Sequence, residues 1–110
     1  MQNKLWRIID ANLNRSREGL RVIEDITRFC FDDERLTGTL KKLRHEITHT
    51  VKNNKKLLSN RNSNIDVGKE YNYRLEGSKS KIKEIVISNF RRVEESLRVL
   101  EDISKIVLPA

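Results

Sequence analysis

The sequence predicts an all-α protein of a single domain. A chain of 110 residues has the usual size of one domain, here spanning residues 1–110. Three segments place their apolar residues at helical spacing. Two of these segments carry the same charged motif, and no segment has the alternating pattern of a strand. Together these observations predict three long helices, of which the first and third are an internal repeat.

The first helix is expected over about residues 3–31. The segment contains no proline, and Gly19 is its single internal glycine. At 100° per residue, one half of the helical wheel collects the apolar side chains and the other half collects most of the charged ones. The apolar half holds Leu5, Ile8, Ile9, Gly19, Leu20, Val22, Ile23, Ile26 and Cys30. This broad apolar arc predicts a helix that packs against more than one neighbour.

The second helix is expected over about residues 34–56. Asp32 and Asp33 precede it and supply a capping position with acidic residues in the first turn. Its apolar residues recur at spacings of four, three, four and four, at Leu36, Leu40, Leu43, Ile47 and Val51. This narrower stripe is typical of a helix that lies in a groove between two broader helices.

A polar, asparagine-rich segment follows over about residues 59–80 and shows no periodicity, which predicts a long loop. Connections longer than about 12–15 residues are uncommon in compact domains and are often functional. Ser78 or Ser80 provides a cap for a third helix over about residues 81–107, which Pro109 would end.

The first and third helices share a repeated motif. Asn12 to Phe29 aligns with Asn89 to Ile106, 77 positions later, and nine of the 18 pairs are identical, six of them polar or charged. The shared pattern is Asn-x-x-Arg-x-x-Glu-x-Leu-Arg-Val-x-Glu-Asp. Two amphipathic helices would repeat their apolar positions anyway, whereas packing alone does not require identical polar residues. The repeat therefore predicts a functional site built from both copies.

Composition narrows the class of partner. The net charge of +7 indicates an anionic partner, such as a phosphorylated metabolite or a nucleotide. Aromatic residues make up only 5% of the chain and no basic stripe interleaves with them, which argues against a nucleic-acid binder. No run approaches the roughly 18 apolar residues of a membrane helix. One cysteine, Cys30, excludes an internal disulfide, so we expect a cytoplasmic protein without membrane contact.

The motif offers two kinds of polar residue. Glu18, Arg21 and Asp25 lie on the polar half of the wheel, where they would form either a solvated, ion-paired surface or part of a site. Asn12 falls inside the apolar arc with Arg15 at its edge, and Asn89 and Arg92 repeat this placement. Such residues would either form a satisfied buried network or line a pocket between the two helices that binds an anion.

Further candidates lie outside the repeat. The middle helix carries Arg44 and His45, the latter as a pocket hydrogen-bonding group or a surface residue. The expected loop carries Arg61 and the sequence Asp66-Val67-Gly68, in which the aspartate would bind a metal or cap a turn.

In these residues the chain resembles a known family. The segment from Asp10 to Phe29 (DANLNRSREGLRVIEDITRF) is similar to the opening of the small all-helical hydroxymethylpyrimidine phosphate kinases of thiamine biosynthesis. In many bacteria that module is fused ahead of thiamine phosphate synthase. Leu43-Arg44-His45, Arg61, Asp66-Val67-Gly68 and the motif copy from Asn89 to Glu101 fit the rest of the pattern in order. The resemblance covers nearly the whole chain.

The resemblance implies transfer of the ATP γ-phosphoryl group to 4-amino-5-hydroxymethyl-2-methylpyrimidine phosphate with Mg²⁺. Since the family pattern assigns no roles, chemistry suggests them. The residues expected to contact phosphate are Arg15, Arg92, Arg44 and Arg61. The residues expected to hold Mg²⁺ are Glu18, Glu95 and Asp66, and Asp66 is also grouped with Arg15 and Arg92 as catalytic. The remaining substrate-binding candidates are Asn12 and Asn89, for the aminopyrimidine, with His45 and Gly68.

Two expectations concern partners. The apolar arcs of the first and third helices exceed what one narrow helix covers, so we expect a homodimer that completes a helical bundle. Thiamine phosphate synthase is a further expected partner. The alternative to a kinase is a non-catalytic helical module that binds a phosphorylated metabolite or docks on that synthase.

Overall fold

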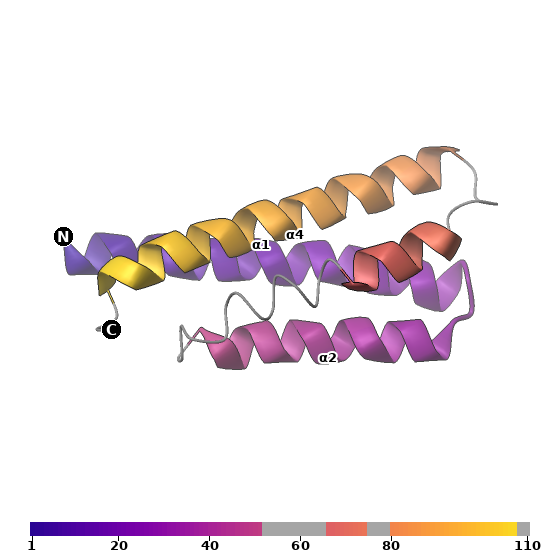
Figure 1. Ribbon diagram of the computed structural model, residues 1–110, viewed down its shortest axis with the longest axis horizontal. Coiled ribbons are helices and arrows are strands. Elements are labelled where there is room, and N and C mark those ends of the chain that lie inside the picture. Colours follow the sequence, from indigo (N-terminus) through magenta and orange to yellow (C-terminus); the bar gives the residue numbers. More distant parts are fainter. Residues whose placement is uncertain (52–65, 75–79, 108–110) are drawn as a thin grey trace.

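The computed structural model describes residues 1–51, 66–74 and 80–107, which form four helices and no strand within those ranges (Figure 1). Helix α1 covers Gln2–Phe29, α2 covers Glu34–Thr50 and α4 covers Ser80–Val107, with a short helix at 66–74. The all-α class and the three long helices are confirmed. The prediction that 59–80 is a loop is wrong for residues 66–74.

The turn between α1 and α2 follows the expected acidic pair. α1 ends at Phe29, two residues before the predicted end. Asp32 adopts a left-handed φ of 49°, which aspartate tolerates better than most residues. Asp33 caps α2, and its Oδ1 accepts a hydrogen bond of 2.9 Å from the backbone N–H of Leu36. The cap satisfies one of the free N–H groups of the first turn.

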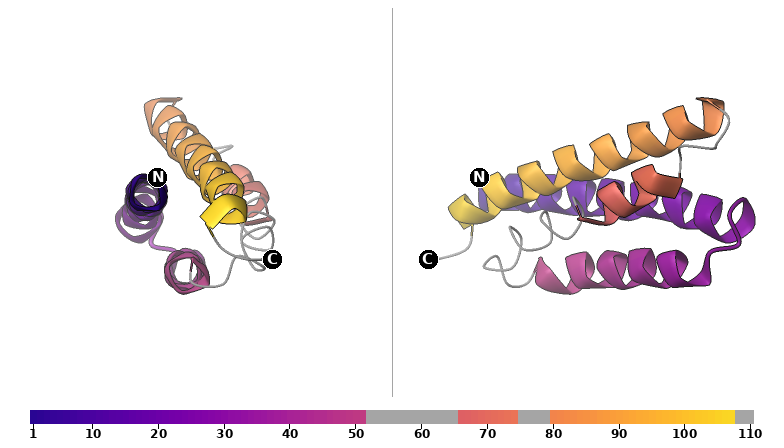
Figure 2. Two further views of the ribbon diagram at one scale, coloured as in Figure 1. Left: turned by 90° about the vertical axis from the view of Figure 1, so that its left-hand side faces the viewer. Right: turned by 45° about the vertical axis from the view of Figure 1, so that its right-hand side comes forward.

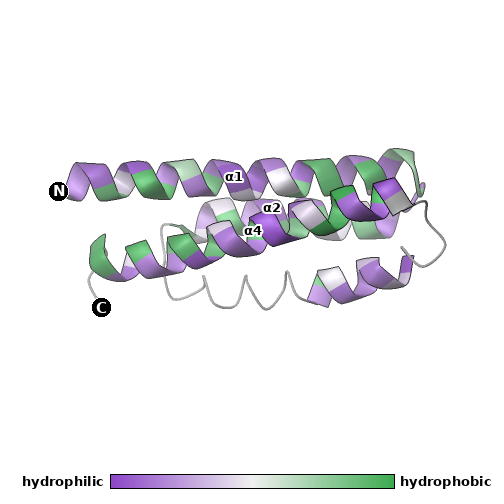
Figure 3. Ribbon diagram, turned by 90° about the horizontal axis from the view of Figure 1, so that it is seen from above, coloured by the Kyte–Doolittle hydropathy of each residue, from purple (hydrophilic) through white to green (hydrophobic). Residues whose placement is uncertain are grey.

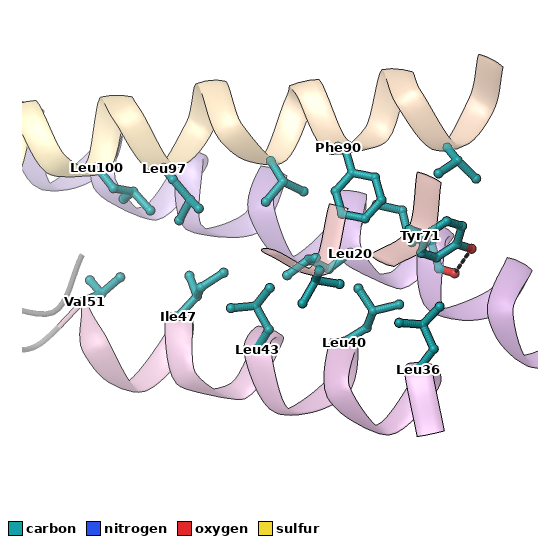
Figure 4. Packing of buried hydrophobic residues seen from close by; sticks show 14 of the residues in the cluster. Leu20, Leu36, Leu40, Leu43, Ile47, Val51, Tyr71, Phe90, Leu97 and Leu100 are labelled. Carbon is teal, nitrogen blue, oxygen red and sulfur yellow. Dashed lines mark hydrogen bonds between the residues drawn. The ribbon is translucent and has the colours of Figure 1, made fainter. Parts of the chain in front are cut away.

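The leucine-rich stripe of α2 forms one side of the core. Its five members, Leu36, Leu40, Leu43, Ile47 and Val51, are all buried, as their spacing predicted. Figure 4 shows them pointing from α2 toward Leu97 and Leu100 of α4 and toward Leu20 of α1. Residues 52–56, the last part of the predicted second helix, lie outside the described residues.

The short helix at 66–74 is held by Tyr71. Its side chain is fully buried, and its hydroxyl donates a hydrogen bond of 3.0 Å to the backbone carbonyl of Ile23. Its ring contacts Phe31 and Phe90, with centroids 5.7 and 5.5 Å away. Burial raises the pKa of Tyr71, so the hydroxyl keeps its proton and remains a donor at neutral pH. The short helix thereby joins α1 to α4.

α1 packs against both α4 and α2. It runs antiparallel to α4, so that the N-terminus of α1 and the end of α4 lie at the same end of the molecule (Figure 1). Seen end on, α2 and the short helix lie on one side of the α1–α4 pair (Figure 2). Each of the described helices is too short or too polar to cross a membrane.

Candidate functional site

The centre of the α1–α4 contact is made by small residues from both motif copies. The hydroxyls of Ser16 and Ser96 share a hydrogen bond of 2.6 Å. A Cβ added to Gly19 would lie only 2.8 Å from Cγ2 of Val93. In the repeat alignment Ser16 corresponds to Val93 and Gly19 to Ser96. The alignment therefore converts the Ser16–Ser96 contact into the Val93–Gly19 contact. The crossing accordingly has approximate two-fold symmetry.

The two motif asparagines are buried and make the same bond. Nδ2 of Asn12 donates to the carbonyl of Ile8 at 2.9 Å, and Nδ2 of Asn89 donates to the carbonyl of Ile85 at 2.8 Å. Asn89 lies against Gly19, whereas Asn12 is seven residues, or about 10 Å, further along α1. The asparagines therefore flank the crossing on opposite sides and do not meet.

Arg15 and Arg92 lie at the crossing itself, directly before Ser16 and Val93. Both side chains are exposed, and Nη1 of Arg15 also lies 3.4 Å from Oδ1 of Asn12, to which it donates. Arg15 and Glu24 are nine residues apart, which places them on opposite sides of α1. Because Glu24 binds α2, Arg15 faces away from α2.

The same reasoning applies to Arg92. Phe90 contacts Tyr71 of the short helix, and Arg92 is two residues, or about 200°, further round α4. Both arginines therefore share the face of the α1–α4 pair that α2 and the short helix leave uncovered. Glu18 and Glu95, each three residues after its arginine, are exposed at the rim of this face.

The other half of the first motif copy faces α2. Nε and Nη2 of Arg44 donate to the Glu24 carboxylate at 2.7 and 3.3 Å, and both side chains are largely buried. The guanidinium fork of Arg44, expected to hold a phosphate, is thus bound to a carboxylate. A polar pocket of about 180 Å³ surrounds this ion pair, and its lining includes Arg21, Asp25 and Lys41.

This pocket continues into a groove of about 760 Å³ between the end of α1 and the start of α2. The two share the side chains of Arg28, Thr37 and Lys41. At the far side of the groove, Arg74 of the short helix donates two hydrogen bonds, of 3.0 and 2.6 Å, to Oδ2 of Asp33. The N–H of Leu36 and the Arg74 guanidinium hold the pKa of Asp33 below its usual range.

The remaining predicted residues do not join either cluster. Asp66 is exposed at the start of the short helix, and Gly68 lines a separate pocket of about 280 Å³ between that helix and α4. His45 is exposed on α2. Arg61 lies outside the described residues.

The acidic side chains that were expected to hold Mg²⁺ form no metal site by themselves within the described residues. The described ranges contain no group of three or more His, Cys, Asp or Glu side chains able to hold a metal. Mg²⁺ commonly binds one or two carboxylates and completes its shell with water and substrate phosphates. Glu18 and Glu95 are single exposed carboxylates, each three residues after its arginine.

Sequence reasoning did not select three residues of the groove, Arg28, Lys41 and Arg74. Lys41 belongs to a basic run on α2, which was the available signal for it. Arg74 gave no signal, because its position depends on the short helix that the sequence did not predict.

Comparison with known proteins identifies the family of this chain. The ThiD2 family matches residues 7–110, so this chain belongs to the ThiD2 family. It is 41% identical over 109 residues to the thiamine-phosphate synthase of a Nostoc species, covering 99% of this chain and 30% of that protein.

Two further relatives carry the same name. The thiamine-phosphate synthase of a Synechocystis species is 38% identical over 104 residues, with 94% of this chain and 30% of that protein covered. That of Rhodopirellula baltica is 35% identical over 101 residues, with 90% and 27% covered. The chain thus spans less than a third of the length of these relatives. No solved structure matches it.

Proposed function

We propose that this chain is an ATP-dependent kinase of thiamine biosynthesis that phosphorylates 4-amino-5-hydroxymethyl-2-methylpyrimidine phosphate to the diphosphate. Membership of the ThiD2 family and relatives named thiamine-phosphate synthase support the pathway. The structural observation that best supports this reaction is the crossing of α1 and α4. There, two arginines from two copies of one motif share a face that no described helix covers.

This arrangement suits phosphoryl transfer to a phosphate. The acceptor is already ionised, so the reaction needs positioning and charge neutralisation more than a strong base. Arg15 and Arg92 provide two planar guanidinium groups able to bind phosphate oxygens in bidentate fashion. Mg²⁺ would neutralise charge on the transferred group, held by Glu18 and Glu95. Asp66, at the start of the short helix on the other side of the α1–α4 pair, would not join them. Asn12 and Asn89 each retain a second amide N–H for the aminopyrimidine.

The charged groove between α1 and α2 is the competing location. Arg28 and Lys41 line it, and its volume is that of a small-ligand pocket. However, it lies on the opposite side of α1 from Arg15, so the two places cannot hold the reacting phosphates of one transfer within a single chain. Variants in the two places therefore distinguish them.

The deciding experiment is a coupled assay with ATP, Mg²⁺ and the pyrimidine phosphate. We expect Arg15→Ala and Arg92→Ala each to lower kcat/KM by about 10-fold to 100-fold, as for loss of one charge-assisted hydrogen bond. Arg17→Ala, two residues or about 200° from Arg15 round α1, is the control and should retain activity. Loss of activity in Lys41→Ala with Arg15→Ala unaffected would move the site to the groove. Binding of the pyrimidine phosphate without ATP consumption, in protein of verified fold, would show a non-catalytic module.

A further inference from the structure

The uncovered face of α1 and α4 carries exposed apolar side chains at regular spacing. They recur every seven residues along each helix, with an arginine in the series. The α1 row is Ile8, Arg15, Val22 and Phe29, and the α4 row is Ile85, Arg92, Val99 and Ile106. Val99 is half-buried, and Phe29, at the end of α1, also lines the groove between α1 and α2. Ile85 and Ile106 are 48% and 63% exposed, and Phe29 is 72% exposed. In Figure 3, which looks onto this side of the α1–α4 pair, bands of hydrophobic colour alternate with hydrophilic ones along both helices.

The two rows are copies of each other. Every member of the α1 row corresponds to the member of the α4 row 77 positions later, so the approximate two-fold symmetry of the crossing extends over the whole face. A seven-residue apolar spacing is the pattern by which helices pack side by side in bundles. A face that repeats itself about a two-fold axis is suited to an isologous contact, in which the same patch is used twice.

We infer that this face binds a second copy of the chain. In the dimer, the α1–α4 pair of one copy packs on the α1–α4 pair of the other, and Arg15 and Arg92 of both copies lie at the centre. The size of the face agrees with this occupant. Each helix has 28 residues, about 42 Å of helix, and two helices side by side are about 20 Å wide. That gives about 800 Å² per copy, the standard area of a stable interface.

The arginine charges at the centre of the dimer suggest that it binds a phosphate ligand, an inference that rests on the proposed kinase activity. Four guanidinium groups near the centre would repel one another, and the flanking Glu18 and Glu95 offset part of that charge. A polyphosphate anion bound between the copies would offset the rest and would bind the dimer more tightly than the monomer. The second copy then completes the phosphate site, and ligand and dimer stabilise each other.

The first test is the mass in solution. The wild-type chain should have twice its mass of 13.0 kDa by light scattering. Val22→Glu and Ile85→Glu should reduce the mass to that of one chain while keeping the helical circular dichroism signal, because both positions are exposed in the single chain. Tyr73→Glu, at an 80% exposed site on the short helix, is the control and should remain dimeric. A monomeric wild type, or dimers that survive both substitutions, would overturn the inference.

The second test separates the shared site from simple dimerisation. Inorganic pyrophosphate at 100 times its own Kd should lower the dimer dissociation constant by about 100-fold. The double variant Arg15→Ala, Arg92→Ala should dimerise at least as tightly without the anion and should lose this response, whereas Arg17→Ala should keep it. A wild-type dimer that ignores pyrophosphate would refute the shared site. A responsive dimer without kinase activity would refute the proposed reaction alone.

Discussion

The hydroxyl oxygens of Ser16 and Ser96 lie 2.6 Å apart where α1 crosses α4, and both side chains are buried. The repeat relates this contact to a second one in the same crossing, between Gly19 and Val93. Small side chains at both places let the two backbones approach closely, and this close approach brings Arg15 and Arg92 to one crossing. The crossing is therefore both the packing centre of the molecule and the centre of the proposed site.

Gly19→Ala should destabilise the protein. The new Cβ would lie 2.8 Å from Val93 and 3.2 Å from the backbone carbonyl oxygen of Asn89, and such overpacking costs about 1–3 kcal/mol. The gain of about 1 kcal/mol from replacing glycine in a helix offsets part of this cost. Gly38→Ala is the matched control, since its Cβ would meet nothing within 4 Å and should stabilise by up to about 1 kcal/mol. Urea unfolding compares the two, and equal midpoints would contradict the close contact.

Arg44→Met should lower the free energy of unfolding by about 2–3 kcal/mol, because it leaves the Glu24 carboxylate without its partner at a largely buried site. The double variant Glu24→Gln, Arg44→Met should recover part of this loss, since no charge is then stranded. Lys105→Met is a comparison in the second motif copy, where Lys105 lies 3.7 Å from Glu101 on the surface of one helix. Its effect should stay below about 0.5 kcal/mol. A comparable loss in both variants would show that burial of the Glu24–Arg44 pair is unimportant.

Asp33 should make the stability of the protein fall in acid. Its pKa is lowered by the N–H of Leu36 first and by Arg74 second, so the folded state favours the carboxylate. The stabilisation is complete above the ordinary aspartate pKa near 4 and is lost as the pH falls through the lowered value in the folded state. In urea unfolding between pH 7 and pH 2.5, Asp33→Asn should be less stable at pH 7 and should show a shallower fall. Asp32→Asn, at the exposed neighbour, should follow the wild type; an unchanged slope for Asp33→Asn would assign the acid sensitivity to other groups.

Under the proposed function, the enzyme should discriminate strongly against unphosphorylated hydroxymethylpyrimidine. A site built around charged substrate oxygens leaves its own arginines unpaired when the phosphate is missing. Loss of two charge-assisted hydrogen bonds corresponds to about 10²-fold or more in kcat/KM. Steady-state kinetics on the alcohol and on its phosphate measure the ratio, and equal values would remove the phosphate-centred site. Glu18→Gln or Glu95→Gln should in addition lower turnover and raise the Mg²⁺ concentration needed for half-maximal activity.

Local periodicity was sufficient to predict the three long helices and the buried stripe of α2. The apolar residues of each helix recur at a spacing that only a helix brings to one face, so no long-range information was needed. The same applies to the repeat, whose nine identities selected Asn12, Arg15 and Glu18 together with their copies. Helical geometry alone also places Arg15 and Glu24 on opposite sides of one helix, because nine residues correspond to two and a half turns.

Only the tertiary structure determines which helix packs against each side of α1. The helix at 66–74 has few apolar residues and exists because Tyr71 is buried between α1 and α4, a long-range contact that no local pattern reveals. Arg44 has the chemistry of a phosphate ligand, but folding places the Glu24 carboxylate within 2.7 Å of it. The uncovered side of the α1–α4 pair, with Arg15 and Arg92 upon it, follows from where α2 packs, because helix packing depends on side chains far apart in the chain.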